Sequence, residues 1–499
     1  MKNTGNWKQI RIWTVLVLCL ILLAGCGTTA PSGTESAEAG AETGAQEESQ
    51  AEESAAGTET GAEAVPEGQE TSVEEQDLEP QGPEFHIYCS SDVFRNRLQG
   101  YYPGYKRLNS RLGMIGETKV VWHMISPEDG DYRDILQEAL EAQEQEIDFM
   151  VLSEEDLPVL AQSGYALSLE EDLGFTEEEL SDQFPYTREL ASDGDGVQRA
   201  ATWQAVPGVF VYRRSIAEEV LGTDDPAEVQ EMIADWELFA ERAPEMTARK
   251  YFMLSGYMDA YKAYADGAET PWVQDGEIVI SESLQDWMTM ANDFTNHRQH
   301  HSTDLRSGEW YSDQTGSGKV FGFFTPAWSI HYTMQDSVEG SEDEDSAFGD
   351  YAVCMGPQPY HWEGIYLAAA EGTDNERLAA DIIRTMTCTP EVLKQITLEL
   401  SEFTNTQSGM EELASEECED VFAQDLLGGQ NPMPLYLEIA KELHVRPVTQ
   451  YDTDLDAGFQ VCAKNFFTGK MTRDAAITNF FKVAVKRHPE LTYEGAEAN

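Results

Sequence analysis

The amino-acid composition of the chain changes abruptly at Pro83. From Gly27 to Pro83 the chain consists mainly of Glu, Ala, Gly, Ser and Thr, and it contains no Lys, Arg or aromatic residue. Such a segment cannot bury enough apolar surface to offset the entropy of ordering it, and its like charges keep it extended. We therefore interpret it as a disordered spacer in front of a folded body, with an acidic interaction tail as the alternative.

The folded body spans the roughly 415 residues after Pro83, in which aromatic, aliphatic and charged residues are mixed. A single hydrophobic core rarely grows beyond about 250–300 residues, so two lobes are expected. Short apolar runs predict strands at 84–91, 117–126 and 147–153, and the apolar spacing at 131–145 predicts a helix. Strands joined by helices in this way favour a parallel sheet with right-handed crossovers, and the expected fold class is α/β.

The first residues of the chain have the pattern of a secretory signal. Three basic residues and no acidic residue precede an apolar run from Ile12 to Ala24, which is shorter than the about 20 residues that cross a bilayer. The run ends in Leu23-Ala24-Gly25-Cys26, which resembles the lipobox of bacterial lipoproteins. The resemblance implies a signal peptide at 1–25, lipidation of Cys26 and attachment to the extracellular face of the cell membrane. The alternative is an ordinary signal peptide or a short anchor.

Charge and motif content exclude several classes of function. The chain carries 92 acidic and 32 basic residues, whereas nucleic-acid binding requires a basic surface, so no nucleic-acid partner is expected. The cysteines show no CxxC spacing, and we expect no metal site and no cofactor. The histidine-rich segment 296–304 could supply metal ligands, but a solvated surface is the preferred interpretation. No GxSxG or HExxH motif is present, and the acids are too numerous to single out a glycosidase pair.

A series of short landmarks runs through the folded body. They are Asp148-Phe149-Met150-Val151, Gly164-Tyr165-Ala166-Leu167, Asp195-Gly196, Val206-Pro207, Trp236-Glu237-Leu238, Gly322-Phe323-Phe324 with Trp328, Met355-Gly356-Pro357, Thr389-Pro390-Glu391 and Gly469-Lys470-Met471-Thr472. Their order, over nearly all of 84–490, resembles the extracellular solute-binding proteins of ABC importers, in particular the large sugar-binding group. The chain departs from the family pattern at Arg213-Arg214, where Asn-Lys is usual, and this departure concerns the ligand more than the fold.

The resemblance implies a two-lobed periplasmic-binding-protein-like (type II) fold, whose lobes close on a ligand like a hinged clamp. The N-terminal lobe would consist of 84–204 plus 356–390, and the C-terminal lobe of 205–355 plus 391–495. Hinge crossings would connect the lobes at more than one place. Residues 26–83, beginning with the lipidated cysteine, would link this body to the membrane.

Candidate ligand-binding residues follow from the loops of such a fold. Ligands lie between the lobes, at the carboxyl ends of parallel strands. Aromatic rings can cover the apolar face of a sugar, while carboxylates and amides bind its hydroxyl groups. On this basis the candidates are Asp92, Glu154, Trp203, Tyr257, Trp328 and Trp362. For each tryptophan the alternative is packing in the core.

The function that this resemblance implies is capture of a small solute, best matched by a sugar or oligosaccharide, for ABC permease subunits. The protein would not be an enzyme, would act as a monomer and would touch the membrane only through its lipid anchor. Three alternatives stay open. One is a surface-tethered carbohydrate-active hydrolase, and another is a binding protein for a peptide or a polyamine, which the acidic charge balance would suit. The third is an adhesin or scaffold without a small ligand.

Overall fold

The computed structural model of the chain describes residues 81–142, 146–339, 346–446 and 448–494. The predicted signal peptide, the predicted lipidation site Cys26 and nearly all of the acidic spacer lie outside these residues. None of the described helices is both long and apolar enough to cross a membrane.

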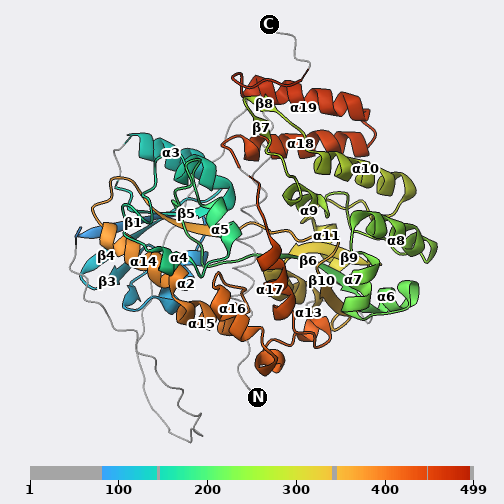
Figure 1. The fold of residues 1–499 in the computed structure, drawn as a ribbon, viewed down its shortest axis with the longest axis horizontal. Helices are drawn as coiled ribbons and strands as arrows, with labels where there is room; N and C mark the ends of the chain where they lie inside the picture. The colour runs from blue at the N-terminus through green and yellow to red at the C-terminus, as the bar shows by residue number, and fades with distance from the viewer. Residues whose placement is uncertain (1–80, 143–145, 340–345, 447, 495–499) are drawn as a thin grey trace, which may run out of the picture.

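The described residues form two main sheets and a two-stranded hairpin. The larger main sheet lies on the left of Figure 1 and has six strands in the order β11-β5-β1-β4-β3-β2. These strands are β1 (Glu84–Cys89), β2 (Tyr105–Arg107), β3 (Leu112–Ile115), β4 (Thr118–Met124), β5 (Phe149–Ser153) and β11 (Ile365–Ala369). β1 pairs in parallel with both β4 and β5, which confirms the parallel arrangement expected for these three strands. The outer strands β11, β3 and β2 run antiparallel to their neighbours.

The smaller sheet has three antiparallel strands in the order β10-β6-β9. They are β6 (Gly208–Arg213), β9 (Gly322–Pro326) and β10 (Tyr351–Cys354). All residues of β9 and β10, and all but the last of β6, are buried, so these strands read as continuous apolar runs in the sequence. A separate two-stranded hairpin turns at Asp275-Gly276 and consists of β7 (Val273–Gln274) and β8 (Glu277–Ile278).

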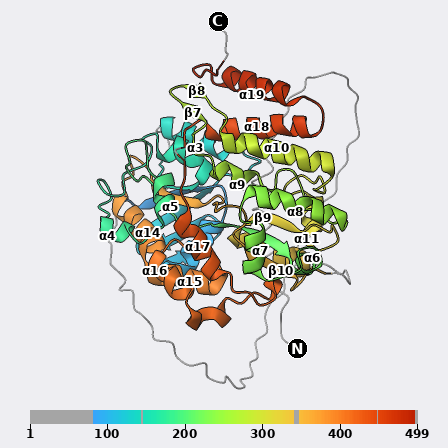
Figure 2. The ribbon, with the colours of Figure 1, turned by 45° about the vertical axis from the view of Figure 1, so that its right-hand side comes forward.

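Helices surround both sheets (Figures 1 and 2), and in Figure 1 α17 lies between the elements around the larger sheet and those around the smaller sheet. The helices that precede β6 are α2 (Val93–Tyr101), α3 (Tyr132–Ala142), α4 (Glu177–Leu180) and α5 (Pro185–Leu190). Those between β6 and β10 are α6 (Arg214–Leu221), α7 (Pro226–Met232), α8 (Trp236–Ala248), α9 (Tyr261–Asp266), α10 (Glu282–His297), α11 (Gly308–Gln314), α12 (Ala327–Ser329) and α13 (Gln335–Glu339). The last are α14 (Glu376–Cys388), α15 (Pro390–Leu400), α16 (Gln407–Leu413), α17 (Met433–Glu442), α18 (Asp452–Phe467) and α19 (Arg473–Arg487).

Three clusters of buried hydrophobic side chains hold these elements together. One belongs to the larger sheet and includes Phe85 and Trp203, and a second belongs to the smaller sheet and includes Phe210. The third contains residues from both sheets, among them Met150 of β5 and Val211 of β6. The two groups of elements therefore share apolar contacts as well as chain crossings.

The exact division of the chain into lobes stays a prediction, and two segments pack differently from the expected boundaries. Apolar residues of α15 belong to the cluster of the larger sheet, although the sequence places 391–495 in the C-terminal lobe. Conversely, Tyr360 and Trp362 pack in the cluster of the smaller sheet, although the sequence places 356–390 in the N-terminal lobe. Long-range packing decides these positions, and the spacing of apolar residues does not reveal it.

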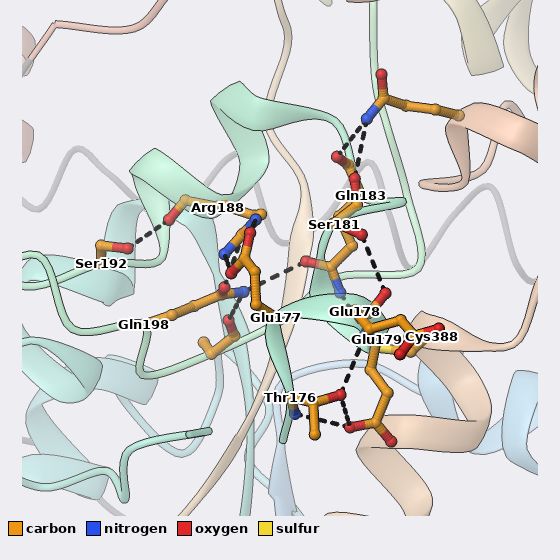
Figure 3. Close-up of polar contacts among 12 residues, drawn as sticks. Thr176, Glu177, Glu178, Glu179, Ser181, Gln183, Arg188, Ser192, Gln198 and Cys388 are labelled. Atoms are coloured by element: carbon orange, nitrogen blue, oxygen red, sulfur yellow. Dashed lines mark hydrogen bonds and ion pairs between the residues drawn. The ribbon is translucent and has the colours of Figure 1, made fainter. Parts of the chain in front are cut away.

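Side-chain hydrogen bonds around α4 and α5 fix the part of the chain that precedes its passage from the larger to the smaller sheet (Figure 3). Two guanidinium nitrogens of Arg188 donate to the two carboxylate oxygens of Glu177, at 3.0 and 2.7 Å. The side-chain amide of Gln198 donates to the side-chain oxygen of Gln183 at 3.3 Å and to the carbonyl of Ala200 at 3.0 Å. These bonds position the chain immediately before it passes to the smaller sheet.

Candidate functional site

The chain enters the smaller sheet directly after Val206-Pro207, and this crossing between the two sheets brings three distant segments of the chain together. The backbone N–H of Trp362 donates to the carbonyl of Val206 at 2.9 Å, and that of Ala327 donates to the carbonyl of Pro207, also at 2.9 Å. Trp328 follows directly after Ala327 at the end of β9. Two of the predicted tryptophans, Trp328 and Trp362, therefore stand beside the same crossing.

Gly208 permits this close approach of the segments. Its backbone N–H donates to the carbonyl of Tyr360 at 2.7 Å, and a Cβ atom at this position would lie 2.1 Å from the Tyr360 ring. The Tyr360 hydroxyl in turn donates to the carbonyl of Val209 at 2.8 Å. Only a residue without a side chain fits between the backbone and this buried ring.

Trp328 and Trp362 line one small solvent-connected hollow, with about 20 Å³ of free volume in this conformation. Trp328 is half-buried and Trp362 is 5% exposed. Polar groups of the wall include a guanidinium and four hydroxyl side chains, which belong to Arg306, Tyr311, Thr325, Ser329 and Thr333. The guanidinium carbon of Arg306 lies 5.7 Å from the centre of the Trp362 ring. Aromatic faces next to hydrogen-bond donors form a suitable surface for a sugar ring.

A mostly buried ionic cluster lies next to the hollow, at the carboxyl end of β5. The carboxylate of Glu154 faces Nε2 of His361 at 2.8 Å. The other ring nitrogen, Nδ1, lies 2.5 Å from a carboxylate oxygen of Asp266 on α9. Nζ of Lys262, also on α9, lies 3.4 Å from Asp266 and 3.7 Å from Glu154. Two carboxylates thus face two basic groups across the junction between the larger sheet and α9.

The members of this cluster favour one another's charged forms. Burial alone would lower the pKa of His361, but the carboxylates of Asp266 and Glu154 raise it to about 9. Burial alone would raise the pKa of Asp266, but the charges of His361 and Lys262 lower it to about 2. The same balance lowers the pKa of Glu154, because His361 and Lys262 outweigh its burial. The cluster is therefore ionised at neutral pH.

Glu154 occupies its predicted position because a capped turn ends β5. The carboxylate of Asp156 accepts hydrogen bonds from the backbone N–H of Ser153 at 3.0 Å and from its hydroxyl at 2.7 Å. Glu154 begins the resulting 3-10 turn, Glu154–Asp156 (η1), and this turn directs its carboxylate toward His361. Three of the six candidates, Glu154, Trp328 and Trp362, are thus close to the crossing.

For Trp203 the structure favours the alternative interpretation, packing in the core. Its side chain is 0% exposed, and its ring centre lies 5.7 Å from that of Phe94. The indole N–H donates to the buried carboxylate of Glu402 at 3.2 Å, and the same carboxylate pairs with Arg97. A ring enclosed in this way has no face available for a ligand in this conformation.

Tyr257 and Asp92 also have partners outside the hollow. The hydroxyl of Tyr257 donates to Asp304 at 2.9 Å, and its ring, 7% exposed, packs against Phe467. Asp92 precedes the first residue of α2 and pairs with Arg95 at 3.2 Å. The structure does not bring these two candidates together with Trp328 and Trp362.

Four charged or titratable residues of the site were not among the sequence candidates. They are Lys262, Asp266, Arg306 and His361. The position of His361 between two aromatic residues at 360–362 was the available signal in the sequence. Lys262, Asp266 and Arg306 have no such signal, because only the fold brings α9 and the loop before α11 to the crossing.

The histidine-rich segment does not converge on a single point. Nε2 of His300 lies 2.8 Å from the Thr295 hydroxyl, whereas Nδ1 of His301 lies 2.8 Å from the carboxylate of Asp313. Within the described ranges, no cluster of three or more His, Cys, Asp or Glu side chains is placed to hold a metal ion.

No protein-family model and no curated protein matches the sequence. Solved structures do match. An extracellular solute-binding protein of family 1 superposes with a TM-score of 0.66 and 15% identity, over 81% of this chain and 99% of its own. The GacH receptor of Streptomyces glaucescens, solved unliganded and with acarbose, gives a TM-score of 0.57 and 16% identity, over 82% and 99%.

A third similar structure is the ABC-transporter-associated binding protein of B. animalis subsp. lactis, solved with β-1,6-galactobiose. It has a TM-score of 0.59 and 16% identity, over 82% of this chain and 99% of that chain. At these identities the similarity establishes the fold. The chain therefore has the two-lobed α/β fold of ABC-transporter solute-binding proteins, as the sequence predicted.

Proposed function

We propose that the protein is an extracellular solute-binding protein that captures a sugar or oligosaccharide for an ABC transporter. The observation that carries this proposal is the hollow lined by Trp328 and Trp362 beside the crossing between the sheets. Clamp-like proteins close on their ligands at such a junction. The similar structures solved with acarbose and with β-1,6-galactobiose support the same class of ligand.

Contacts between the two halves of the molecule support a clamp mechanism. Glu154, from the end of β5, meets His361 and Lys262 at the junction with α9. Separation of the halves would expose these charges, and closure would bury them again with the ligand. Binding energy from the solute would thus be coupled to the contact between the halves.

The proposal includes the predictions that concern the membrane. Cys26 would carry the lipid, the body would lie at the extracellular face of the cell membrane, and ABC permease subunits would receive the solute from a monomer. The protein would release its ligand unchanged. The similar structures are binding proteins, which supports this role over that of a hydrolase.

A melting screen of the full-length chain tests the ligand class directly. The panel contains mono- and oligosaccharides, peptides and polyamines. A ligand at 100 times its Kd should raise the free energy of unfolding by about 2.7 kcal/mol. Chromatography of each stabilising saccharide after incubation should recover it intact. Release of smaller sugars would instead support the hydrolase alternative, and stabilisation by peptides or polyamines alone would replace the sugar in the proposal.

Substitution of the two tryptophans tests the location of the site. Trp328→Ala and Trp362→Ala should each weaken sugar affinity at least about tenfold, because each removes an aromatic face and its apolar area. Isothermal titration calorimetry measures the Kd. Trp272→Ala is the control, since this buried tryptophan packs against Phe459 and Phe480 and lies outside the hollow. Unchanged affinity in both hollow variants would place the ligand elsewhere.

A further inference from the structure

Arg306 is an unexpected residue in the wall of the hollow. The chain carries 92 acidic and 32 basic residues, yet no carboxylate of the described residues pairs with the Arg306 guanidinium. The nearest acid in its own loop, Asp304, is held by Nζ of Lys464 at 2.6 Å and by the Tyr257 hydroxyl at 2.9 Å. The guanidinium is therefore available to a ligand.

The backbone holds Arg306 in this position at a conformational cost. Its φ is 61°, in the left-handed region that residues other than glycine rarely adopt. Hydrogen bonds fix the loop on both sides: the N–H of Thr303 donates to the carbonyl of Ser255 at 3.1 Å, and the N–H of Ser307 donates to that of Asp304 at 3.0 Å. Ser307 then caps α11. A strained residue between two fixed points suggests a functional constraint on its side chain.

The rest of the wall, as far as the structure describes it, offers hydroxyl groups but no charged acceptor. Among the described residues that line the hollow there is no aspartate, glutamate, asparagine or glutamine. The indole Nε1–H of Trp362 is buried and has no hydrogen-bond partner within the described part of the chain. The hydroxyl groups of the wall can accept hydrogen bonds from a sugar, but no carboxylate of the described wall balances the charge of the Arg306 guanidinium. This wall suits a ligand that brings its own strong acceptor.

From these observations we infer that the solute carries a carboxylate, so that it is an acidic saccharide containing a uronic acid. Arg306 binds the carboxylate through its planar fork of N–H groups, and the rings of Trp328 and Trp362 cover the sugar face. This inference rests on the proposed function. The inference also gives a reason for an arginine without an acidic partner among the described residues in a protein of net charge −60. A negatively charged surface repels an anionic ligand, so such a ligand needs a positive group at its binding site.

Matched ligands separate the carboxylate from the sugar. The panel consists of mono- and oligouronides as free acids, the same compounds as methyl esters, the corresponding neutral sugars, and short peptides that carry a terminal carboxylate. The full-length chain is titrated with each by calorimetry at neutral pH. The free acid should bind at least about tenfold more tightly than its methyl ester, as expected for a charge-assisted hydrogen-bonded pair.

Substitution of Arg306 shows whether this residue is responsible for the tighter binding of the free acid than of its methyl ester. In Arg306→Gln the ratio of ester Kd to acid Kd should fall to within about twofold, and Arg306→Lys should restore part of it. Arg298→Gln is the control, because Arg298 also has a positive φ and is exposed outside the hollow. Thermal melting of each variant without ligand confirms that it is folded.

The possible results lead to distinct conclusions. Binding of neutral sugars as tightly as uronides, unaffected by Arg306→Gln, would overturn the inference and leave the proposed function intact. If Arg306→Gln binds uronides with an unchanged ratio of ester Kd to acid Kd, another residue binds the carboxylate. This result would also overturn the inference. Absence of binding by any saccharide, or binding of peptides alone, would overturn both the inference and the proposed function.

Discussion

At the scale of single residues, the tryptophans of the folded body differ in environment and therefore in expected effect. Trp122, Trp203, Trp272 and Trp287 are among the largest fully buried side chains, whereas Trp328 is only partly enclosed by protein. A fully buried ring contributes to the stability of the fold, and a ring with one free face can contribute to binding.

Trp203→Phe separates these two contributions. The free energy of unfolding should fall by about 1–3 kcal/mol, because the smaller ring leaves a cavity and the Glu402 carboxylate loses a hydrogen-bond donor. Sugar affinity should stay unchanged. Urea denaturation and calorimetry measure the two quantities, with Trp328→Phe as the control that should show the opposite pattern. Reduced affinity at unaltered stability would return Trp203 to the binding site.

At the scale of elements, α8 supports the helix that carries part of the ionic cluster. Its first residue, Trp236, stacks on Tyr264 of α9 with ring centres 3.8 Å apart. Nε1 of Trp236 also donates to the side chain of Gln358 at 2.7 Å, four residues before Trp362. The start of α8 thus helps to place both α9, with Lys262, and the segment that leads to the hollow.

The cap of α8 can be tested without touching the site. The carboxylate of Asp235 accepts a hydrogen bond from the backbone N–H of Leu238 at 2.7 Å. Asp235→Ala should lower the free energy of unfolding by about 1 kcal/mol, because a helix N–H loses its partner. Asp235→Asn keeps an acceptor and should retain most of the stability in urea denaturation. Equal losses in both variants would show that charge, rather than the cap, is the stabilising feature.

At the scale of the whole molecule, the Glu154 cluster makes the contact between the two halves depend on pH. The pKa of His361 rises from about 6.5 to about 9 on folding, with Asp266 and Glu154 opposing the effect of burial. Its stabilising contribution is complete below about pH 6.5 and is lost as the pH rises through about 9. For Asp266, with a pKa of about 2, the contribution is present above about pH 3.8 and is lost as the pH falls through about 2.

The pH dependence can be measured as a difference between proteins. Between pH 6 and pH 9.5 the free energy of unfolding of the wild type should fall more steeply than that of His361→Gln, because only the wild type loses this charge. Asp266→Asn should also flatten the curve, since it removes the main charge that raises the pKa of His361. Urea denaturation at several pH values provides the data. Parallel curves for all three proteins would mean that folding does not raise the pKa of His361.

The sequence by itself determined the class of the fold and most of its local elements. The apolar runs at 84–91, 117–126 and 147–153 correspond to β1, β4 and β5, and Pro390 marks the start of α15. These features follow from short-range patterns: side-chain periodicity, turn residues and the limits that proline places on a helix. The order of landmarks was enough to indicate two lobes, and the carboxyl end of β5 was enough to indicate Glu154.

Only the tertiary structure decided which residues meet at the crossing. Strand β11 pairs with β5 although more than two hundred residues separate them, and Arg306 faces Trp362 from a loop with no pattern of its own. The same holds for Trp203, whose burial against Phe94 and Glu402 no local periodicity shows. Long-range partners are selected by the burial of apolar faces and the pairing of charges in space, and a pattern read along the chain does not contain these distances.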